Sequence, residues 1–262
     1  MLSKKSDIER LVLSVITVGL CPRDIINTLF PLTNALIDAR VEFVVVTPLT
    51  NLDSIAKYIS AVFVHDQGEG VYQAMNLGIS ASRGDYLWFL NSGDEPLLTP
   101  GSFASLLSSL SCQNFNAVNS TLLVFGFQPL GVIRPWMHFF SSSLFKLLLL
   151  LSIMPVSHQN ILFLRSHHKL FSIRHQYSCD FEILANLILF SECDVLFASS
   201  KPIAKLVAGG ISDSNRLSVF RERYTILSGL PHSFFTPIIP IGFLLRSLRE
   251  LIASKIKTIM GL

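Results

Sequence analysis

The chain has 262 residues, which is enough for one large α/β domain or two small ones and for a substantial buried core. Half of the residues are hydrophobic and 15% are charged, so the chain is more apolar than an average soluble protein. The formal net charge of +3 is too small to indicate nucleic-acid binding, and no C-x-x-C pair indicates a zinc ribbon or a redox motif. Scattered thiols fit a reducing compartment, and the charged N-terminus leads into a strand-like run rather than a signal-peptide core, so we expect a cytoplasmic protein.

Short apolar runs alternate with helical patterns in the first third of the chain. The expected strands are 11–18, 42–46 and 61–64, and the expected helices are 24–39 and 53–60. This alternation at short intervals predicts a parallel sheet built from βαβ units.

The stretch 68–95 combines a helix pattern with a buried strand. Apolar residues recur at helical spacing from Val71 to Ile79, and Gly84 stands where a helix C-cap prefers glycine. The run 86–90 is short and unbroken, which is typical of a strand buried on both faces. It is followed by N-S-G-D-E, so polar and acidic groups are expected at the carboxyl end of a buried strand, where open α/β sheets bind ligands.

Further elements follow this stretch. We expect a helix over 101–110 and a strand over 117–127. The run 136–154 contains a lysine, a histidine and several serines, whereas a membrane span needs about 20 largely apolar residues, so we interpret the run as a buried or interfacial helix. His167 and His168 lack partners at ligand spacing and are expected in a solvated loop.

Three motifs stand in an ordered combination: G-V-Y-Q-A-M-N-L-G (70–78), R-G-D-Y (83–86) and F-L-N-S-G-D (89–94). Together they resemble the signature of family 2 glycosyltransferases with the GT-A fold, and most of all the colanic-acid-type branch that builds bacterial surface polysaccharides. Weaker matches follow, and they extend the resemblance, with gaps, over about residues 11–225. These matches are H-Q (158–159), D-F-E (180–182) and G-G-I-S (209–212).

The resemblance implies a GT-A-like (Rossmann-like) fold, in which a mixed, mostly parallel sheet is flanked by helices. It implies a glycosyltransferase domain over 1–235, with a nucleotide-sugar-binding half at 11–94 and an acceptor half at 95–235. The periodicity of the remaining residues separately predicts a C-terminal amphipathic helix as an extension at 236–262. The implied reaction transfers a hexosyl or related group from a nucleotide-sugar donor to a polysaccharide or lipid-linked acceptor with inversion. No nucleic acid is implied as a partner.

Asp94 is the candidate metal ligand, because Mn²⁺ and Mg²⁺ prefer oxygen ligands and could offset the charge of a diphosphate leaving group. The D-x-D pattern of the resembled family is replaced by Asn91-Ser92-Gly93 with Asp94 beside it, and Asn91 still offers a carbonyl oxygen. The alternative is that Asp94 only caps this loop or a following turn.

The resemblance also implies residues on the donor and acceptor sides. The donor-binding candidates are Thr17, Thr47, Tyr72, Asn76, Arg83, Asn91, Ser92 and Gly93. The candidates on the acceptor or diphosphate side are His158, Gln159 and Glu182. For Arg83 the alternative is an ordinary surface arginine, and for His158 it is a structural histidine.

Several acids of the resembled pattern are missing. Thr47 and Pro48 stand where an aspartate and a glycine are typical, and Gly68 and Gln73 replace two further acids. These substitutions favour an alternative function, that of a catalytically weak or inactive, membrane-associated assembly partner. A sugar-nucleotide-forming nucleotidyltransferase is disfavoured, because the loop after the first strand has only one glycine and one arginine.

The acceptor hydroxyl needs a general base, and Asp180 and Glu182 compete for this role. Residues two apart on a helix do not share a face, so only one of them can point into a pocket. The resemblance assigns the base to Asp180. The alternative makes Asp180 the N-cap of the apolar helix that follows.

The C-terminal stretch carries one apolar face with basic residues around it. The apolar face consists of Leu244, Leu248, Leu251, Ile252, Ile256 and Ile259. The basic residues are Arg246, Arg249, Lys255 and Lys257, against the single acid Glu250. A basic amphipathic helix suits an anionic membrane surface, here the inner face of the cell membrane, and the alternative is packing on protein.

Overall fold

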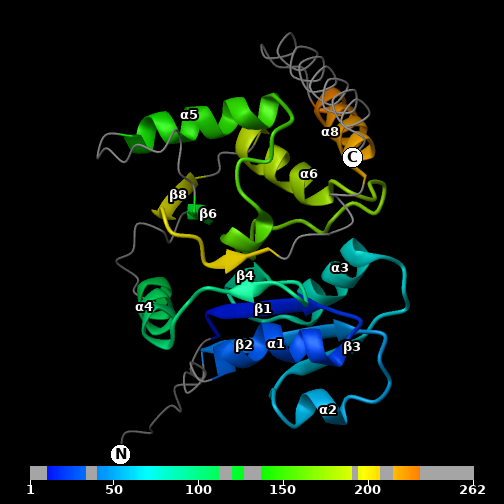
Figure 1. Cartoon of the computed structure of the whole chain (residues 1–262). Coiled ribbons are helices and arrows are strands. Elements are labelled where there is room, and N and C mark those ends of the chain that lie inside the picture. Colours follow the sequence, from blue (N-terminus) through cyan, green and yellow to red (C-terminus); the bar gives the residue numbers. More distant parts are fainter. Residues whose placement is uncertain are drawn as a thin grey trace, which may run out of the picture. The chain divides into compact units, whose positions relative to one another are not determined.

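The computed structural model describes residues 11–33, 40–111, 120–126, 137–190, 194–206 and 215–230. In this part of the chain seven strands form one sheet in the order β3-β2-β1-β4-β7-β6-β8, and two short strands, β5 and β9, form a second (Figure 1). The strands are β1 (Leu13–Val18), β2 (Val41–Thr47), β3 (Val62–His65), β4 (Tyr86–Phe89), β5 (Glu95–Pro96), β6 (Ser120–Phe125), β7 (Ile161–Leu164), β8 (Asp194–Ser199) and β9 (Ala204–Lys205). The helices are α1 (Pro22–Thr33), α2 (Asp53–Ala56), α3 (Val71–Ala81), α4 (Pro100–Ser111), α5 (Met137–Leu150), the 3₁₀ turn η3 (His158–Asn160), α6 (Cys179–Ala185), the π-helical turn η4 (Asn186–Phe190) and α8 (Arg216–Gly229).

Strands β3, β2, β1 and β4 are parallel, as the alternating pattern predicts. Strand β7 lies antiparallel to both β4 and β6, and β6 is parallel to β8. The sheet is therefore mixed and mostly parallel, and the fold class expected from the sequence is confirmed. Because β7 runs in the opposite direction, its first residues lie at the edge of the sheet where β1, β2 and β4 end.

Helices cover both faces of the parallel half. On one face, helices α1 and α4 contribute apolar side chains such as Leu29 and Phe103 to a core that also contains Phe43 and Trp88 of the strands. On the other face, α3 packs so closely on β1 that a Cβ added at Gly78 would collide with a side chain of the strand. The sheet is thus buried on both faces, which explains why its strands are continuous apolar runs.

Most expected elements are confirmed with shifted ends. The helix expected over 101–110 is α4, the short helix over 53–60 is α2, and the run 136–154 forms α5. Helix α3 ends at Ala81, so Gly84 is not its C-cap; a Cβ at Gly84 would lie 2.7 Å from the backbone of β1. In the described ranges, no helix combines the length and the apolarity needed to cross a membrane.

The chain divides into two compact units that interleave along the sequence. The first unit comprises residues 1–127, 158–171 and 194–207, and it contains both sheets. The second comprises 128–157, 172–193 and 208–262, and its described helices are α5, α6, η4 and α8. The division into continuous halves at residue 94 stays a prediction, and the expected extension over 236–262 lies outside the described residues.

Candidate functional site

In the first unit, the loop that follows β4 is anchored at the carboxyl edge of the sheet. The backbone N–H of Ser92 donates to the carbonyl of Val18 at the end of β1 (3.0 Å), and the N–H of Asp94 donates to the carbonyl of Asn91 (3.0 Å). Gly93 has a φ of +96°, a conformation that side chains disfavour. The loop is therefore a fixed turn, and its glycine is required by the backbone.

A side chain of helix α1 is hydrogen-bonded to the same turn. The hydroxyl of Thr28 accepts a hydrogen bond from the N–H of Gly93 (2.9 Å) and donates one to the carbonyl of Asp94 (2.9 Å). Thr28 is buried, so both bonds are shielded from water. The turn thus has anchors other than the carboxylate of Asp94, which does not need to cap the loop.

The Asp94 carboxylate is buried and bonded by Gln159. The side-chain amide of Gln159 donates to Asp94 Oδ2 (3.0 Å), and the carbonyl of Gln159 accepts from the indole N–H of Trp88 (2.8 Å). The side-chain oxygens of Gln159 and Asn91 are buried and have no hydrogen-bond partner among the described residues. A buried polar atom without a partner is costly, so these oxygens are candidates for binding a ligand.

A divalent metal fits the chemistry of these donors. Mg²⁺ and Mn²⁺ are bound through carboxylate and amide oxygens, which Asp94 and Asn91 supply. In the described residues, no three His, Cys, Asp or Glu side chains gather into a metal site formed by protein alone. A metal held by one or two carboxylates and by substrate phosphates is the usual arrangement for Mg²⁺.

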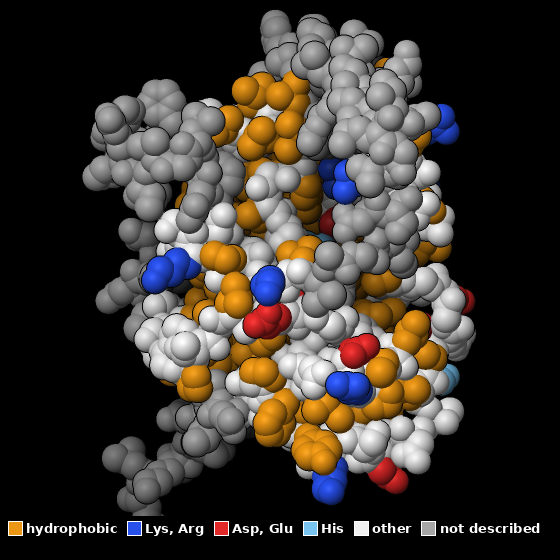
Figure 2. All heavy atoms as spheres, viewed as in Figure 1, with side chains coloured by type: hydrophobic (Ala, Val, Ile, Leu, Met, Phe, Trp, Pro, Cys, Tyr) orange, Lys and Arg blue, Asp and Glu red, His pale blue; other side chains and the backbone are white. Residues whose placement is uncertain are grey.

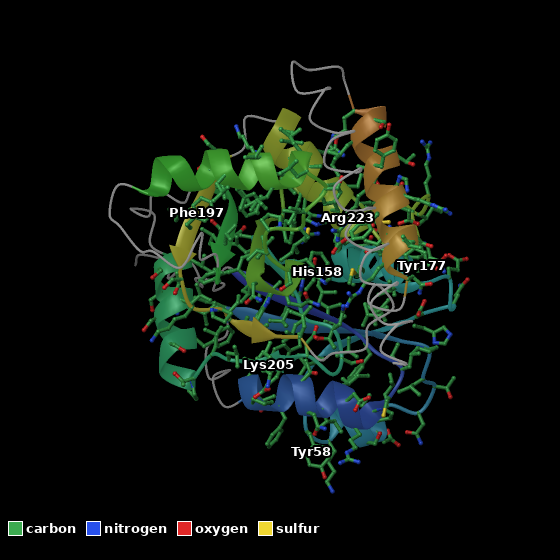
Figure 3. The ribbon with its side chains drawn as sticks, turned by 45° about the horizontal axis from the view of Figure 1, so that its top comes forward. Tyr58, His158, Tyr177, Phe197, Lys205 and Arg223 are labelled. Carbon is green, nitrogen blue, oxygen red and sulfur yellow. The ribbon has the colours of Figure 1, made fainter. Side chains whose placement is uncertain are left out.

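The 3₁₀ turn η3 also fixes the strand beside this loop. Asn160 Oδ1 accepts from the N–H groups of Ile203 (2.8 Å) and Ala204 (3.0 Å), and Asn160 Nδ2 donates to the carbonyl of Ala204 (3.0 Å). These residues lead into β9, which pairs with β5 directly after Asp94. His158 begins η3, and Figure 3 labels it together with Lys205 of β9. The antiparallel strand β7 is the reason that the residues of η3 reach this edge, and sequence patterns did not predict Asn160.

The ends of β1 and β2 contribute Thr17 and Thr47 to the same edge. Thr17 Oγ1 is buried without a partner in the described part of the chain, whereas Thr47 Oγ1 accepts from the N–H of Leu49 (3.3 Å). Asp66, directly after β3, is buried and accepts from the N–H of Gly68 (3.0 Å). Sequence reasoning missed Asp66, although its position directly after a strand was a usable signal.

Three donor-side candidates have structural partners instead. Arg83 lies at the amino edge of the sheet, where its Nε is 3.2 Å from Oε2 of the buried Glu42. Asn76 uses both amide atoms on the backbone of Phe171 (3.0 and 2.8 Å), and the ring of Tyr72 packs on that of Phe171. The structure therefore places Arg83 at the opposite edge from Asp94, while Asn76 and Tyr72 both contact Phe171.

The expectation that His168 lies in a solvated loop is wrong. Its ring packs among Phe89, Phe163 and Phe171, with centroid distances of 4.9 to 5.3 Å. Burial lowers the pKa of His168 to about 4. The imidazole is therefore neutral and structural.

In the second unit, Asp180 and Glu182 lie in the first turn of α6. The N-cap residue is Ser178, so the N-cap alternative for Asp180 is wrong. Asp180 Oδ1 accepts from the N–H of Phe181 (2.8 Å), while Glu182 Oε2 is buried with no partner among the described residues. A carboxylate in the first turn is favoured by the helix dipole, and Asp180 stays the predicted base.

No protein-family model matches the chain, and no curated protein sequence matches it. Solved structures with a similar fold include residues 1–349 of S. aureus TarS, at a TM-score of 0.57 and 16% identity over 89% of this chain and 70% of that one. They also include glucosyl-3-phosphoglycerate synthase from Mycobacterium tuberculosis in complex with Mn²⁺, UDP and phosphoglyceric acid, at a TM-score of 0.55 and 15% identity over 85% of this chain and 80% of that one. A mycobacterial protein matches at a TM-score of 0.56 and 18% identity, over 85% of this chain and 76% of that one. At these identities the likeness shows a shared GT-A-like fold.

Proposed function

We propose that this chain is a glycosyltransferase that moves a sugar from a nucleotide-sugar donor to a saccharide acceptor. The observation that supports this most is the buried Asp94 carboxylate, bonded to Gln159 (3.0 Å), at the edge where such sheets bind nucleotides. Proteins with a similar fold bind the corresponding ligands: S. aureus TarS is known with UDP and with UDP-GlcNAc, and the mycobacterial synthase with UDP and Mn²⁺.

The residues around Asp94 suit a nucleoside diphosphate that leaves during the reaction. Asp94 and Asn91 would hold a divalent metal, Mn²⁺ or Mg²⁺, which when bound offsets the charge that develops on the diphosphate. Gln159 orients the Asp94 carboxylate, and Thr28 fixes the turn that carries it. These contacts keep the carboxylate in place before the donor arrives, which is the arrangement that electrostatic stabilisation requires.

The donor side of the proposal uses Thr17, Thr47, Ser92 and Gly93, all at the carboxyl edge. Asp66 joins them as a buried carboxylate after β3. Arg83 is left out, because it lies at the opposite edge of the sheet, whereas Asn76 and Tyr72 stay donor-side candidates from the resemblance.

The acceptor side is proposed from the resemblance alone. Asp180 acts as the base that takes the proton of the acceptor hydroxyl in an inverting displacement, and His158 and Glu182 line the acceptor or diphosphate side. The acceptor is a growing surface polysaccharide or a lipid-linked saccharide, as in the branch that the motifs resemble.

The second candidate is a catalytically weak relative that serves as an assembly partner. It is favoured by Thr47, which offers a hydroxyl bonded to the N–H of Leu49 (3.3 Å) where the resembled family has a carboxylate. Asp66 opposes this view, since it supplies a buried carboxylate at the end of the next strand.

A thermal-shift screen separates the two candidates. UDP-, GDP- and dTDP-sugars are each added with and without Mn²⁺, because a ligand that binds only the folded state raises the melting temperature. We expect at least one donor to raise the melting temperature, and more so with Mn²⁺. The absence of a shift with every donor would favour the assembly partner.

A further inference from the structure

Glu222 of α8 holds the segment that leads into α6. Its two carboxylate oxygens accept hydrogen bonds from consecutive backbone N–H groups, those of Gln176 and Tyr177, each at 2.8 Å. One turn earlier on α8, the carbonyl of Val219 accepts from the hydroxyl of the buried Ser178 (3.3 Å). Three consecutive residues are thus tied to α8 immediately before the turn that carries Asp180.

Arg223, the next residue on α8, contacts the residue that follows Asp180 in the first turn of α6. Its guanidinium lies 5.1 Å from the ring centroid of Phe181, and its Nη1 donates to the carbonyl of Ser152 (3.2 Å) after the end of α5. Figure 3 labels both Tyr177 and Arg223 in this part of the second unit. Residues on either side of Asp180 are therefore held by neighbouring side chains of a single helix.

Cys179 contacts the backbone of residues that precede it in the same segment. Its buried thiol lies 2.6 Å from the carbonyl of Ser172 and 2.7 Å from that of His175. Burial and the nearby carboxylates of Glu182 and Asp180 raise the pKa of the thiol to about 12, so it is protonated and able to donate at neutral pH. Because the thiol is buried and the thiolate is the reactive form, a thiol-specific reagent modifies Cys179 only when the segment opens.

We infer that Glu222 is a positioning residue, which fixes the segment 176–181 and through it the carboxylate of Asp180. The inference rests on the proposed function, in which Asp180 is the base. A base must lie within hydrogen-bond reach of its proton, and a displacement of about 1 Å can cost about a hundredfold in rate. Only a carboxylate offers two acceptors to two adjacent N–H groups, since glutamine would turn its own N–H₂ towards one of them.

Glu222→Gln tests this in the full chain through two measurements. The first is the labelling rate of Cys179 by a thiol reagent under native conditions, read by peptide mass spectrometry against the exposed Cys21 as an internal standard. We expect Cys179 to react about 10- to 100-fold faster, the range that the loss of one hydrogen bond to a charged group gives. The second is steady-state transfer, in which kcat falls while the affinity for the donor, measured by calorimetry, is unchanged.

Ile226→Val is the matched control, because it removes one buried methylene from the same helix and leaves the Glu222 carboxylate in place. We expect it to change neither the labelling of Cys179 relative to Cys21 nor kcat. Unchanged labelling of Cys179 in Glu222→Gln would show that Glu222 does not hold the segment 176–181. Faster labelling with an unchanged kcat would show that the segment does not position Asp180. If the wild type transferred no sugar, the proposed function would fall, whereas the labelling rates would still decide whether Glu222 holds the segment.

Discussion

At the scale of single residues, the burial of the Asp94 carboxylate costs free energy, and the same carboxylate is the proposed metal ligand. A buried carboxylate is stable only when it is hydrogen-bonded or paired, and Gln159 supplies one such bond. The neighbouring Asn91 oxygen has no partner in the described residues. A cation or its water ligands would supply the partner that this Asn91 oxygen lacks among the described residues.

Replacing Asp94 by alanine should therefore weaken binding of a nucleoside diphosphate with Mn²⁺ by at least about tenfold, the scale of changes at metal sites. The fold should survive, because Thr28 and the backbone hold the turn. Titration calorimetry gives the affinity. Glu95→Ala is the control, since Glu95 is exposed and its ion pair with Lys205 contributes little. An unchanged affinity in Asp94→Ala would assign Asp94 a structural role.

Asp180→Asn should abolish transfer while sparing donor binding. The amide keeps nearly the same shape and can still accept from Phe181 N–H, but it cannot take a proton, and general-base help is typically worth about 10²–10⁴ in rate. Glu182→Gln is the internal comparison, and we expect it to lose much less activity, because residues two positions apart on a helix do not share a face and only Asp180 is assigned as the base. The measurement is turnover of a matched donor and acceptor. Loss of activity only in Glu182→Gln would transfer the base assignment to that residue.

His168 should make stability depend on pH below neutrality. Its pKa falls from an ordinary 6.5 to about 4 on folding, so the unfolded chain binds the proton more readily and stability is lost as the pH falls below about 6.5. This accounts for roughly 2 kcal/mol between pH 7.5 and 5. Urea unfolding of the wild type and of His168→Phe at both pH values checks it. An equal pH dependence in the two proteins would contradict the neutral, buried imidazole.

At the scale of elements, Asn160 joins η3 to β9 and so sets the strand beside the Asp94 loop. Asn160→Ala leaves two buried N–H groups, those of Ile203 and Ala204, without their acceptor. We expect a loss of about 2–4 kcal/mol in the free energy of unfolding. Chemical denaturation measures the loss, and Asn51→Ala, in an exposed turn, is the control with a small expected effect. A loss below about 0.5 kcal/mol would show that β9 does not depend on this side chain.

The sequence predicted those elements whose signals are local. The alternation of apolar runs and helical patterns predicted β1 to β4, and the polar sequence after β4 identified the Asp94 loop. It did not reveal that β7 is antiparallel, because a short apolar run has no direction in its pattern. The bonds of Thr28 to Asp94 and of Asn76 to Phe171 span 66 and 95 residues, and no periodicity reports such pairs. The roles of these residues therefore needed the folded structure.

At the scale of the whole molecule, the described residues on the face drawn in Figure 2 show no concentration of positive charge. On the face drawn in Figure 2, the described Lys and Arg side chains lie singly among hydrophobic and polar ones, some with Asp or Glu nearby. The formal net charge of the whole chain is +3, which is small for 262 residues.

The stretch 241–262, which lies outside the described residues, is predicted to bind an anionic membrane. Each Lys or Arg near such a surface contributes about 1 kcal/mol, and the apolar face of the stretch adds to this. We expect the intact chain to float with anionic liposomes and a chain that ends at residue 240 to float much less. Neutral liposomes are the control. Equal flotation of both chains would remove this role from the C-terminal stretch.

The position of β7 between β4 and β6 has a consequence for the newly made chain. Strands β1 to β4 leave the ribosome first, but the partner of the free edge of β4 follows about 70 residues later. Protein synthesis adds about 5–20 residues per second, so the edge of β4, Tyr86–Phe89, stays unpaired for roughly 4 to 14 seconds before β7 is made. During that interval the nascent chain presents an unpaired apolar strand, which is the feature that chaperones bind and that nucleates aggregation.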